Sequence, residues 1–280
     1  MAEAKEISGL DCNASAIDWA RQVLEVRFSE VLDLRVAAQD FSEVETVHDM
    51  RVAIRRLRGA LRDFLPLLKK RFLRNVRKDL KQFADALGAV RDEDVAIIAL
   101  KKMLTGIGNE QIKEGVENFL ARRNALREQN RVNLTEILTS KTSQRLERDF
   151  LKSLERSIKN SPLTFNQAGR SAVSQSLDHF LELGVSLYNP FNAPDLHELR
   201  IAAKRLRYAL ELFTACWGAS IKIFADEIAA MQSALGEVHD CDVWIDGLSD
   251  LLLGDSGATT ESEYQTAIWL LSEFTKRRTK

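Results

Sequence analysis

Apolar residues recur every three to four positions along most of the chain, which is the spacing of one face of an α-helix. No segment sustains the strict alternation that a half-buried strand shows. The pattern therefore predicts an all-α fold. The expected helices span residues 13–38, 47–64, 67–87, 92–104, 110–138, 142–160, 166–187, 196–213, 219–235, 240–252 and 261 to the end.

One predicted helix occurs twice. Residues 47–64 (VHDMRVAIRRLRGALRDF) match residues 196–213 (LHELRIAAKRLRYALELF) position by position, 149 residues later. The matching pairs are His48 with His197, Arg51 with Arg200, Arg55 with Lys204, Arg56 with Arg205, Arg58 with Arg207, Leu61 with Leu210 and Phe64 with Phe213. The repeat predicts two halves with similar helical order, residues 1–160 and 161–280.

The repeated helix separates its basic residues from its apolar ones. At about 100° per residue, five basic side chains of the first copy share an arc of roughly 80°. They are His48, Arg51, Arg55, Arg58 and Arg62. Arg56 points away from this basic stripe, and in the second copy Glu211 stands where the first has Arg62.

A charged stripe on a helix is commonly a solvated face, but such faces mix charges of both signs. This stripe carries one sign, so its guanidinium groups repel each other unless an anion lies along them. Arginine also meets phosphate through a rigid, bidentate fork. From Arg51 to Arg62 the stripe extends about 16 Å at 1.5 Å per residue. The pattern therefore indicates a site for an extended anion.

Basic residues also gather beyond the repeated helix. Residues 48–81 hold 12 Lys or Arg against three acidic residues, and the helices at 110–138 and 142–160 carry further basic rows. The basic row of the helix at 142–160 fits a solvent-facing edge as well as it fits an anion-binding surface. The candidates that these helices add to the anion site are Arg74, Lys78, Arg127 and Lys152.

A second block is also repeated: LGAVRDEDV at 87–95 is matched by LGEVHDCDV at 235–243. The glycine of each block is expected to end one helix, and the last aspartate to cap the next. An alternative is that the first aspartate orients the arginines of the stripe by ion pairing; a catalytic carboxylate is a third reading. The residues concerned are Gly88 and Gly236, Asp94 and Asp242, and Asp92 and Asp240.

Composition describes a soluble globular protein, with 45% hydrophobic and 29% charged residues in a chain of 280. The net charge of −1 hides the segregation of basic residues into one region. No apolar run approaches the roughly 20 residues of a membrane span, and the N-terminus lacks the features of a secretory signal. We therefore expect a cytoplasmic protein. Its three cysteines are scattered and odd in number, and are expected to be reduced.

The motif H-x-x-R-x-x-x-[KR]-R-x-R, followed by L-G-x-x-[RH]-D-x-D-V and repeated once, resembles the CHAD family (conserved histidine α-helical domain) over nearly the whole chain. The resemblance implies two antiparallel four-helix bundles around a central basic groove that binds inorganic polyphosphate, without catalysis and without a cofactor. Such binding is compatible with targeting to polyphosphate granules and with polyphosphate-metabolising enzymes as partners; storage and the regulation of such an enzyme are open alternatives. The acidic E-x-E-x-K signature of the metalloenzyme domain fused to some members is absent, so this resembles a stand-alone member.

The predicted polyphosphate site combines the motif positions with the additional basic candidates. The motif positions are His48, Arg51, Arg55, Arg56, Arg58, His197, Arg200, Lys204, Arg205 and Arg207. The additional candidates are Arg62, Arg74, Lys78, Arg127 and Lys152. The family was first proposed to chelate metals, but we expect the two histidines to hydrogen-bond and not to hold a metal, because no second ligand lies at i+4.

Three other functions fit parts of the pattern. The dipeptides His48-Asp49 and His239-Asp240 suggest a metal-dependent phosphohydrolase, but they fall at non-equivalent places in the two repeats. Nucleic acid is not the expected partner, because base-binding surfaces normally interleave aromatic residues and the stripes offer only Tyr208. A scaffold that recruits an acidic protein is the third alternative.

Overall fold

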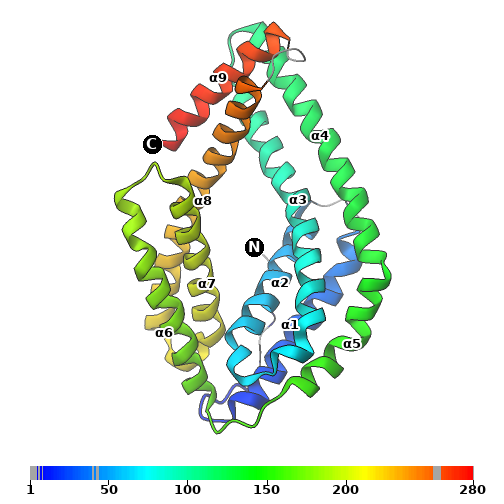
Figure 1. The fold of residues 1–280 in the computed structure, drawn as a ribbon, viewed down its shortest axis with the longest axis vertical. Coiled ribbons are helices and arrows are strands. Elements are labelled where there is room, and N and C mark those ends of the chain that lie inside the picture. Colours follow the sequence, from blue (N-terminus) through cyan, green and yellow to red (C-terminus); the bar gives the residue numbers. More distant parts are fainter. Residues whose placement is uncertain are drawn as a thin grey trace.

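The structure is a computed structural model that describes residues 5, 7, 9–39, 41, 44–254 and 260–279. These residues form nine α-helices and no strand, which confirms the all-α fold (Figure 1). The helices are α1 (Ala16–Ala37), α2 (Val44–Asp63), α3 (Arg74–Leu104), α4 (Glu110–Thr139), α5 (Lys141–Ser157), α6 (Phe165–Leu183), α7 (Ala193–Trp217), α8 (Ala219–Leu253) and α9 (Glu261–Arg278). Among them, none is long and apolar enough to cross a lipid bilayer.

Two helices each join two segments that the sequence predicts as separate helices. α3 runs through Gly88 for 31 residues, and α8 runs through Gly236 for 35 residues. The expected helix ends at these glycines are therefore wrong, and Asp94 and Asp242 lie inside helices and cap none. A glycine inside a helix costs only about 1 kcal/mol relative to alanine. Packing along such long helices outweighs that cost.

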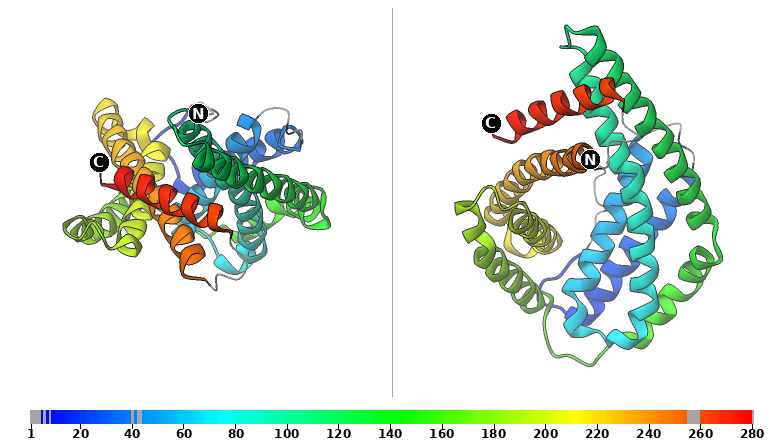
Figure 2. Two further views of the ribbon diagram at one scale, coloured as in Figure 1. Left: turned by 90° about the horizontal axis from the view of Figure 1, so that it is seen from above. Right: turned by 45° about the horizontal axis from the view of Figure 1, so that its top comes forward.

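The helices form two groups that meet at both ends (Figures 1 and 2). The largest core lies mainly among α1, α2, α3 and α5, and a second core lies among α6, α7 and α8. A third core is shared by α3 and α4 of the first group and α8 and α9 of the second. Because cores cross the 160/161 boundary, the division into two separate four-helix bundles stays a prediction.

At the lower end, three fully buried phenylalanines join the groups. The ring centroid of Phe213 on α7 lies 5.8 Å from that of Phe64 at the end of α2 and 4.8 Å from that of Phe165 on α6. Gly169 lets α6 approach closely, since a Cβ there would lie 2.6 Å from the Phe213 ring. This contact sets the end of α2 beside α7.

At the upper end, α4 and α9 approach at a glycine. A Cβ at Gly115 would lie 1.8 Å from Oγ1 of the buried Thr266. Trp244 on α8 stacks on Phe274 of α9, with ring centroids 4.8 Å apart. The two joints hold the groups around a central opening.

The segment before α1 is bonded to both groups. Cys12 forms a disulfide with Cys216 at the end of α7, with 5.5 Å between the Cα atoms. The expectation that all three cysteines are reduced is therefore wrong for this pair. Local sequence patterns do not indicate this pair, because 204 positions separate the two residues. Cys241 is a free thiol.

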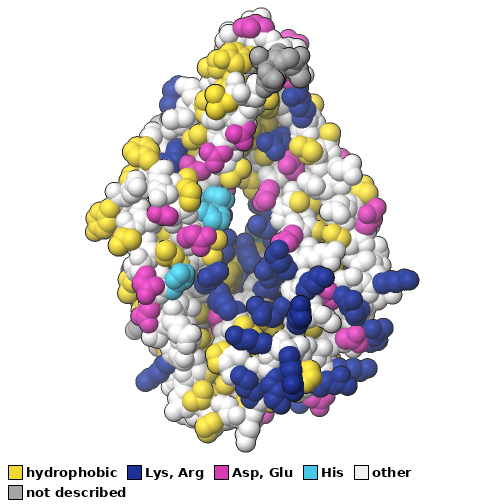
Figure 3. Space-filling model, in the orientation of Figure 1, with side chains coloured by type: hydrophobic (Ala, Val, Ile, Leu, Met, Phe, Trp, Pro, Cys, Tyr) yellow, Lys and Arg dark blue, Asp and Glu magenta, His cyan; other side chains and the backbone are white. Residues whose placement is uncertain are grey.

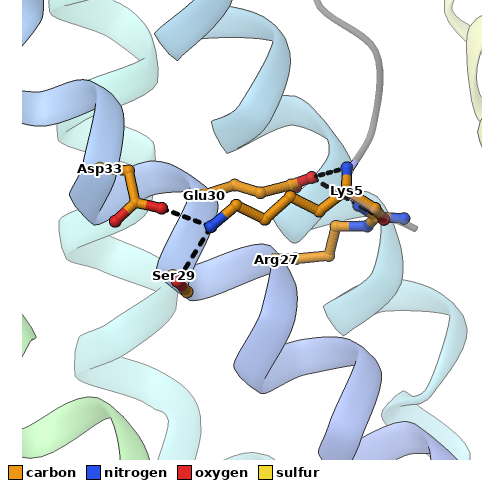
Figure 4. A network of polar contacts seen from close by, with 5 residues as sticks. All are labelled: Lys5, Arg27, Ser29, Glu30 and Asp33. Carbon is orange, nitrogen blue, oxygen red and sulfur yellow. Dashed lines mark hydrogen bonds and ion pairs between the residues drawn. The ribbon is translucent and has the colours of Figure 1, made fainter. Parts of the chain in front are cut away.

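Further towards the N-terminus, Lys5 lies across α1 (Figure 4). Its Nζ donates to Ser29 Oγ at 3.3 Å and pairs with Asp33. The backbone oxygen of Lys5 accepts from Arg27, which also pairs with Glu30 at 2.7 Å. These contacts fix the start of the described chain against α1.

Candidate anion-binding site

A groove of about 950 Å³ opens between the two groups of helices. Eleven of its fifteen lining residues are Lys or Arg, and none of the described residues that line it is acidic. The eleven are Arg55, Arg58, Arg62, Lys70, Arg71, Arg74, Arg77, Lys78, Lys81, Lys204 and Arg205. Figure 3 shows Lys and Arg side chains gathered in and below the central hollow. We call this surface the basic groove.

One face of α3 supplies four of these cations. Arg74, Arg77, Lys78 and Lys81 follow the i, i+3, i+4, i+7 spacing that places side chains on one side of a helix. The sequence predicts Arg74 and Lys78 as site residues, whereas Arg77 and Lys81 belong to the basic cluster at residues 48–81 and are not among the predicted site residues. The i+3 and i+7 spacing from Arg74 is the signal that identifies them.

The two copies of the repeated helix lie side by side at the end of the groove. Gly59 of α2 faces Tyr208 of α7, and a Cβ at Gly59 would lie 3.6 Å from Cβ of Tyr208. Arg62 Nη2 donates to the backbone oxygen of Arg205 at 3.2 Å. This approach brings Lys204 and Arg205 of α7 into the same groove as the α2 stripe.

Farther along the stripe, the repeated block at residues 87–95 lies beside Arg51. Arg51 lies 3.9 Å from Asp92, and a Cβ at Gly88 would lie 4.0 Å from Arg51 Nε. The glycine of the second copy is similarly placed, since a Cβ at Gly236 would lie 3.6 Å from Arg200 Nε. Asp92 thus lies within ion-pair distance of one arginine of the stripe, and its role in orienting the stripe stays a prediction.

Positive charge is crowded around this part of the structure. Burial, followed by the neighbouring Arg55, lowers the pKa of Arg51. Burial also lowers the pKa of Arg200, against the opposing effect of the Asp240 carboxylate. Lys204 is affected most, since burial and then Arg200, Arg55 and Arg51 lower its pKa to about 7. Without a bound anion, the folded protein therefore keeps these cations close together despite their mutual repulsion.

Histidines lie near the stripes but do not line the groove. Nδ1 of His197 lies 3.2 Å from Nδ1 of His239 on α8, a residue that was not among the predicted site residues. Burial, then Arg200 and His197, lowers the pKa of His239 to about 4. Burial also lowers the pKa of His48, with Arg91 as the next cause. His48 and His239 are thus held neutral near pH 7.

One group of side chains has the composition of a metal site. His48 and the carboxylates of Glu45 and Asp49 place one ligand atom each within 4.8 Å of one another. Glu45 is exposed, and exposed carboxylates gather in this way without binding an ion. The expectation that no metal binds here stays a prediction.

Comparison with known proteins identifies the fold. The family model for the CHAD domain matches residues 22–249. The chain belongs to the CHAD domain family. The crystal structure of the CHAD domain from the plant Ricinus communis is 23% identical, with a TM-score of 0.78, and the match covers 99% of this chain and 91% of that one. PptA from Streptomyces chartreusis is 13% identical, with a TM-score of 0.74 and coverages of 95% and 96%. Curated protein sequences give no match.

In this CHAD domain, four further predicted site residues lie outside the basic groove, besides His48, His197, Arg51 and Arg200. Arg56 lines a separate small pocket. Arg207 is 7% exposed and pairs with Glu211 at 2.9 Å. Arg127 on α4 pairs with Asp94 at 3.7 Å, and Lys152 is exposed on α5.

The structure thus divides the predicted residues into two sets. Seven line the groove: Arg55, Arg58, Arg62, Arg74, Lys78, Lys204 and Arg205. The other eight do not line it: His48, Arg51, Arg56, Arg127, Lys152, His197, Arg200 and Arg207. The equivalents Arg56 and Arg205 fall in different sets, so the repeat alone does not determine which residues reach the groove.

Proposed function

We propose that this CHAD domain binds inorganic polyphosphate in the basic groove and does not turn it over. The observation that carries the proposal is the lining of the groove, in which eleven cations converge without a carboxylate among the described lining residues. Nine of the eleven come from the first half of the chain. The first half is therefore expected to supply most of the binding free energy.

Electrostatics favours a ligand with many linked anions. The depressed pKa of Lys204, about 7, reflects burial and repulsion by Arg200, Arg55 and Arg51, and a polyanion relieves that repulsion. Once one phosphate is bound, the next ones in the same chain bind without a further loss of translational freedom. Binding should weaken steeply with salt, as it does when Lys and Arg displace condensed counterions.

Nucleic acid fits the groove less well. Tyr208, the aromatic residue in its lining, is only 8% exposed. The guanidinium groups of Arg207 and Arg55 lie 5.0 Å and 5.7 Å from its ring centroid. Its faces are therefore covered, whereas proteins that bind single strands use open aromatic faces for base stacking.

Titration of the purified protein with long-chain polyphosphate, double-stranded DNA and pyrophosphate at two salt concentrations tests the proposal. We expect polyphosphate to bind tightest, and the combined Arg55→Ala, Arg74→Ala, Lys78→Ala, Lys204→Ala variant to lose affinity at least about tenfold without losing helicity. Equal affinity for DNA and polyphosphate, or no binding of polyphosphate, would sink the idea. Release of orthophosphate during incubation would contradict binding without turnover.

The same titration with a chelator addresses metal. We expect no change, because the basic groove binds the anion directly. A loss of binding that added Mg²⁺ or Mn²⁺ restores would contradict this expectation and point to Glu45, His48 and Asp49.

Location and partners belong to the same proposal: the protein associates with polyphosphate granules in the cytoplasm, beside polyphosphate-metabolising enzymes. The Cys12–Cys216 disulfide is the observation against a cytoplasmic location, because disulfides are rare in reducing compartments. Thiol trapping in intact cells tests whether the protein lies in the reducing cytoplasm or in an oxidising compartment. Reduced Cys12 and Cys216 in cells would support the cytoplasm, and an intact disulfide would contradict it.

A further inference from the structure

A second cavity, of about 280 Å³, adjoins the basic groove at the lower joint. It lies where the end of α2 meets α6. Arg62 and Arg205 line both the cavity and the groove, so they form the border between them. A molecule that fills the cavity can therefore extend charged groups into the groove.

The cavity differs from the groove in its chemistry. Leu67, Leu163 and Ala172 contribute an apolar wall, and Gln175 and Ser176 of α6 contribute polar groups. Apolar walls with a few convergent polar groups are typical of sites for small organic molecules. Polyphosphate has no apolar surface, so it gains little from this wall.

A buried carboxylate in the lining has one oxygen without a partner. The Asp63 side chain is 3% exposed, and its Oδ1 accepts from Arg62 Nε at 2.8 Å. Its Oδ2 is buried and has no hydrogen-bond partner among the described residues. Burial, against the opposing charge of Arg62, raises the pKa of Asp63 to about 6. An unpaired buried acceptor is costly, and a ligand with a donor group removes that cost.

Arg62 connects this carboxylate to the groove. Its side chain is 34% exposed, so it can turn towards an anion in the groove. The outer nitrogens of Arg62 can pair with that anion while its Nε keeps the hydrogen bond to Asp63 Oδ1, which leaves Oδ2 as the acceptor for a ligand in the cavity. A ligand that offers a phosphate to Arg62 and an N–H to Asp63 satisfies both groups at once.

We propose that the cavity accepts the base of a nucleotide, with an exocyclic amino group of the base donating to Asp63 and the phosphates bound by Arg62 and Arg205 in the groove. This inference rests on the proposed function, because the groove must bind phosphate. Cytosine and adenine carry such an amino group. Uracil has a carbonyl oxygen at the position of the cytosine amino group, where it repels a carboxylate. A site that hydrogen-bonds an N–H rejects the analogue that lacks it.

Calorimetric titration of the full chain with CTP, UTP and tripolyphosphate at fixed ionic strength tests the inference. CTP and UTP carry the same charge, so their difference isolates the amino group, and tripolyphosphate probes the groove alone. We expect CTP to bind at least about tenfold tighter than UTP. If tripolyphosphate binds and CTP equals UTP, the nucleotide site is wrong while the proposed function stands. If none of the three binds while long-chain polyphosphate does, the nucleotide site is wrong and the proposed function stands; if long-chain polyphosphate also fails to bind, the proposed function itself fails.

Two variants assign the preference to the cavity. Asp63→Asn removes the carboxylate, and Ala172→Leu fills the cavity while leaving Asp63 in place, so each should make CTP and UTP equal. Ala172→Leu should leave tripolyphosphate affinity unchanged, whereas Asp63→Asn should not lower it, because it frees Arg62 from its pair. Asp79→Asn is the matched control, since Asp79 is also buried and paired with an arginine, Arg145, but lies away from the cavity. A CTP preference that persists in both cavity variants overturns the inference.

Discussion

Nδ1 of His197 lies 3.2 Å from Nδ1 of His239, so one ring nitrogen donates a hydrogen bond to the other, and only one of the two nitrogens carries a hydrogen at this contact. The low pKa of His239, about 4, results from burial, then from Arg200 and His197. Near pH 7, His239 therefore adds no positive charge to the site. His239 is therefore not a charged ligand for phosphate.

This pair should make stability depend on pH. Between about pH 6.5 and 4, the unfolded chain protonates His239 while the folded protein does not, so stability falls as pH falls through this range. Urea unfolding of wild type and His239→Gln at pH 7 and pH 4.5 checks this: the variant should lose less stability. His179→Gln, an exposed histidine on α6, is the control. An equal loss in wild type and His239→Gln would contradict the prediction.

Lys204 should make polyphosphate binding depend on pH above neutrality. Without ligand, the folded protein holds fewer protons at Lys204 than the unfolded chain between about pH 7 and 10.5, so its stability rises with pH there. A bound polyanion favours the ammonium form, so binding takes up a proton, and affinity falls as pH rises from 7 to 9. Lys204→Arg keeps the charge and should flatten this dependence. The same slope in both proteins would exclude Lys204 as its source.

Groove cations should contribute to binding, and basic residues outside it should not. Replacing Arg74 and Lys78 by alanine should lower the slope of log affinity against log salt by about 2. Arg148→Ala with Lys152→Ala removes the same charge from exposed positions on α5 and is the matched control. If the control pair weakens binding as much, then Lys152 belongs to the site as the sequence predicted.

Two glycines should respond oppositely to alanine. Gly115→Ala places a methyl group 1.8 Å from Thr266 Oγ1, so it should push α4 and α9 apart and destabilise the protein by about 1–3 kcal/mol. Gly236→Ala places its methyl at an ordinary 3.6 Å from Arg200 and should stabilise α8 by about 0.5–1 kcal/mol. Urea midpoints of both variants measure the contrast. Destabilisation by both would mean that Gly236 is needed for the approach of Arg200.

The Cys12–Cys216 disulfide closes a loop across most of the chain, with a sequence separation of 204. Cys216→Ser should lower the free energy of unfolding by about 2–5 kcal/mol, largely because the unfolded chain gains freedom. Reduced wild type should match the variant in urea unfolding, and Cys241→Ser should stay close to wild type. An unchanged midpoint after reduction would show that the bond adds no stability.

Local periodicity was sufficient for the helical fold and for the first wall of the groove. The i+3 and i+4 spacing of apolar and basic residues follows from 3.6 residues per turn, so it identified the all-α class and placed Arg55, Arg58 and Arg62 on one face. It misjudged Gly88 and Gly236, because the cost of a helical glycine is small against packing that a sequence does not display.

Tertiary structure decided which charged faces meet. Arg56 and Arg205 are equivalent in the repeat, yet only Arg205 lines the groove, because α7 packs against the end of α2 through Phe64 and Phe213. The same joint brings Asp63 beside α6. The contact of Cys12 with Cys216 cannot be inferred from local sequence patterns, because 204 positions separate the two residues. The sequence by itself determined the helices and their basic stripe, since both depend on neighbours a few residues away. Contacts between distant segments decide which residues line the groove and the cavity and which cysteines form the disulfide. Only the packed chain defines those contacts.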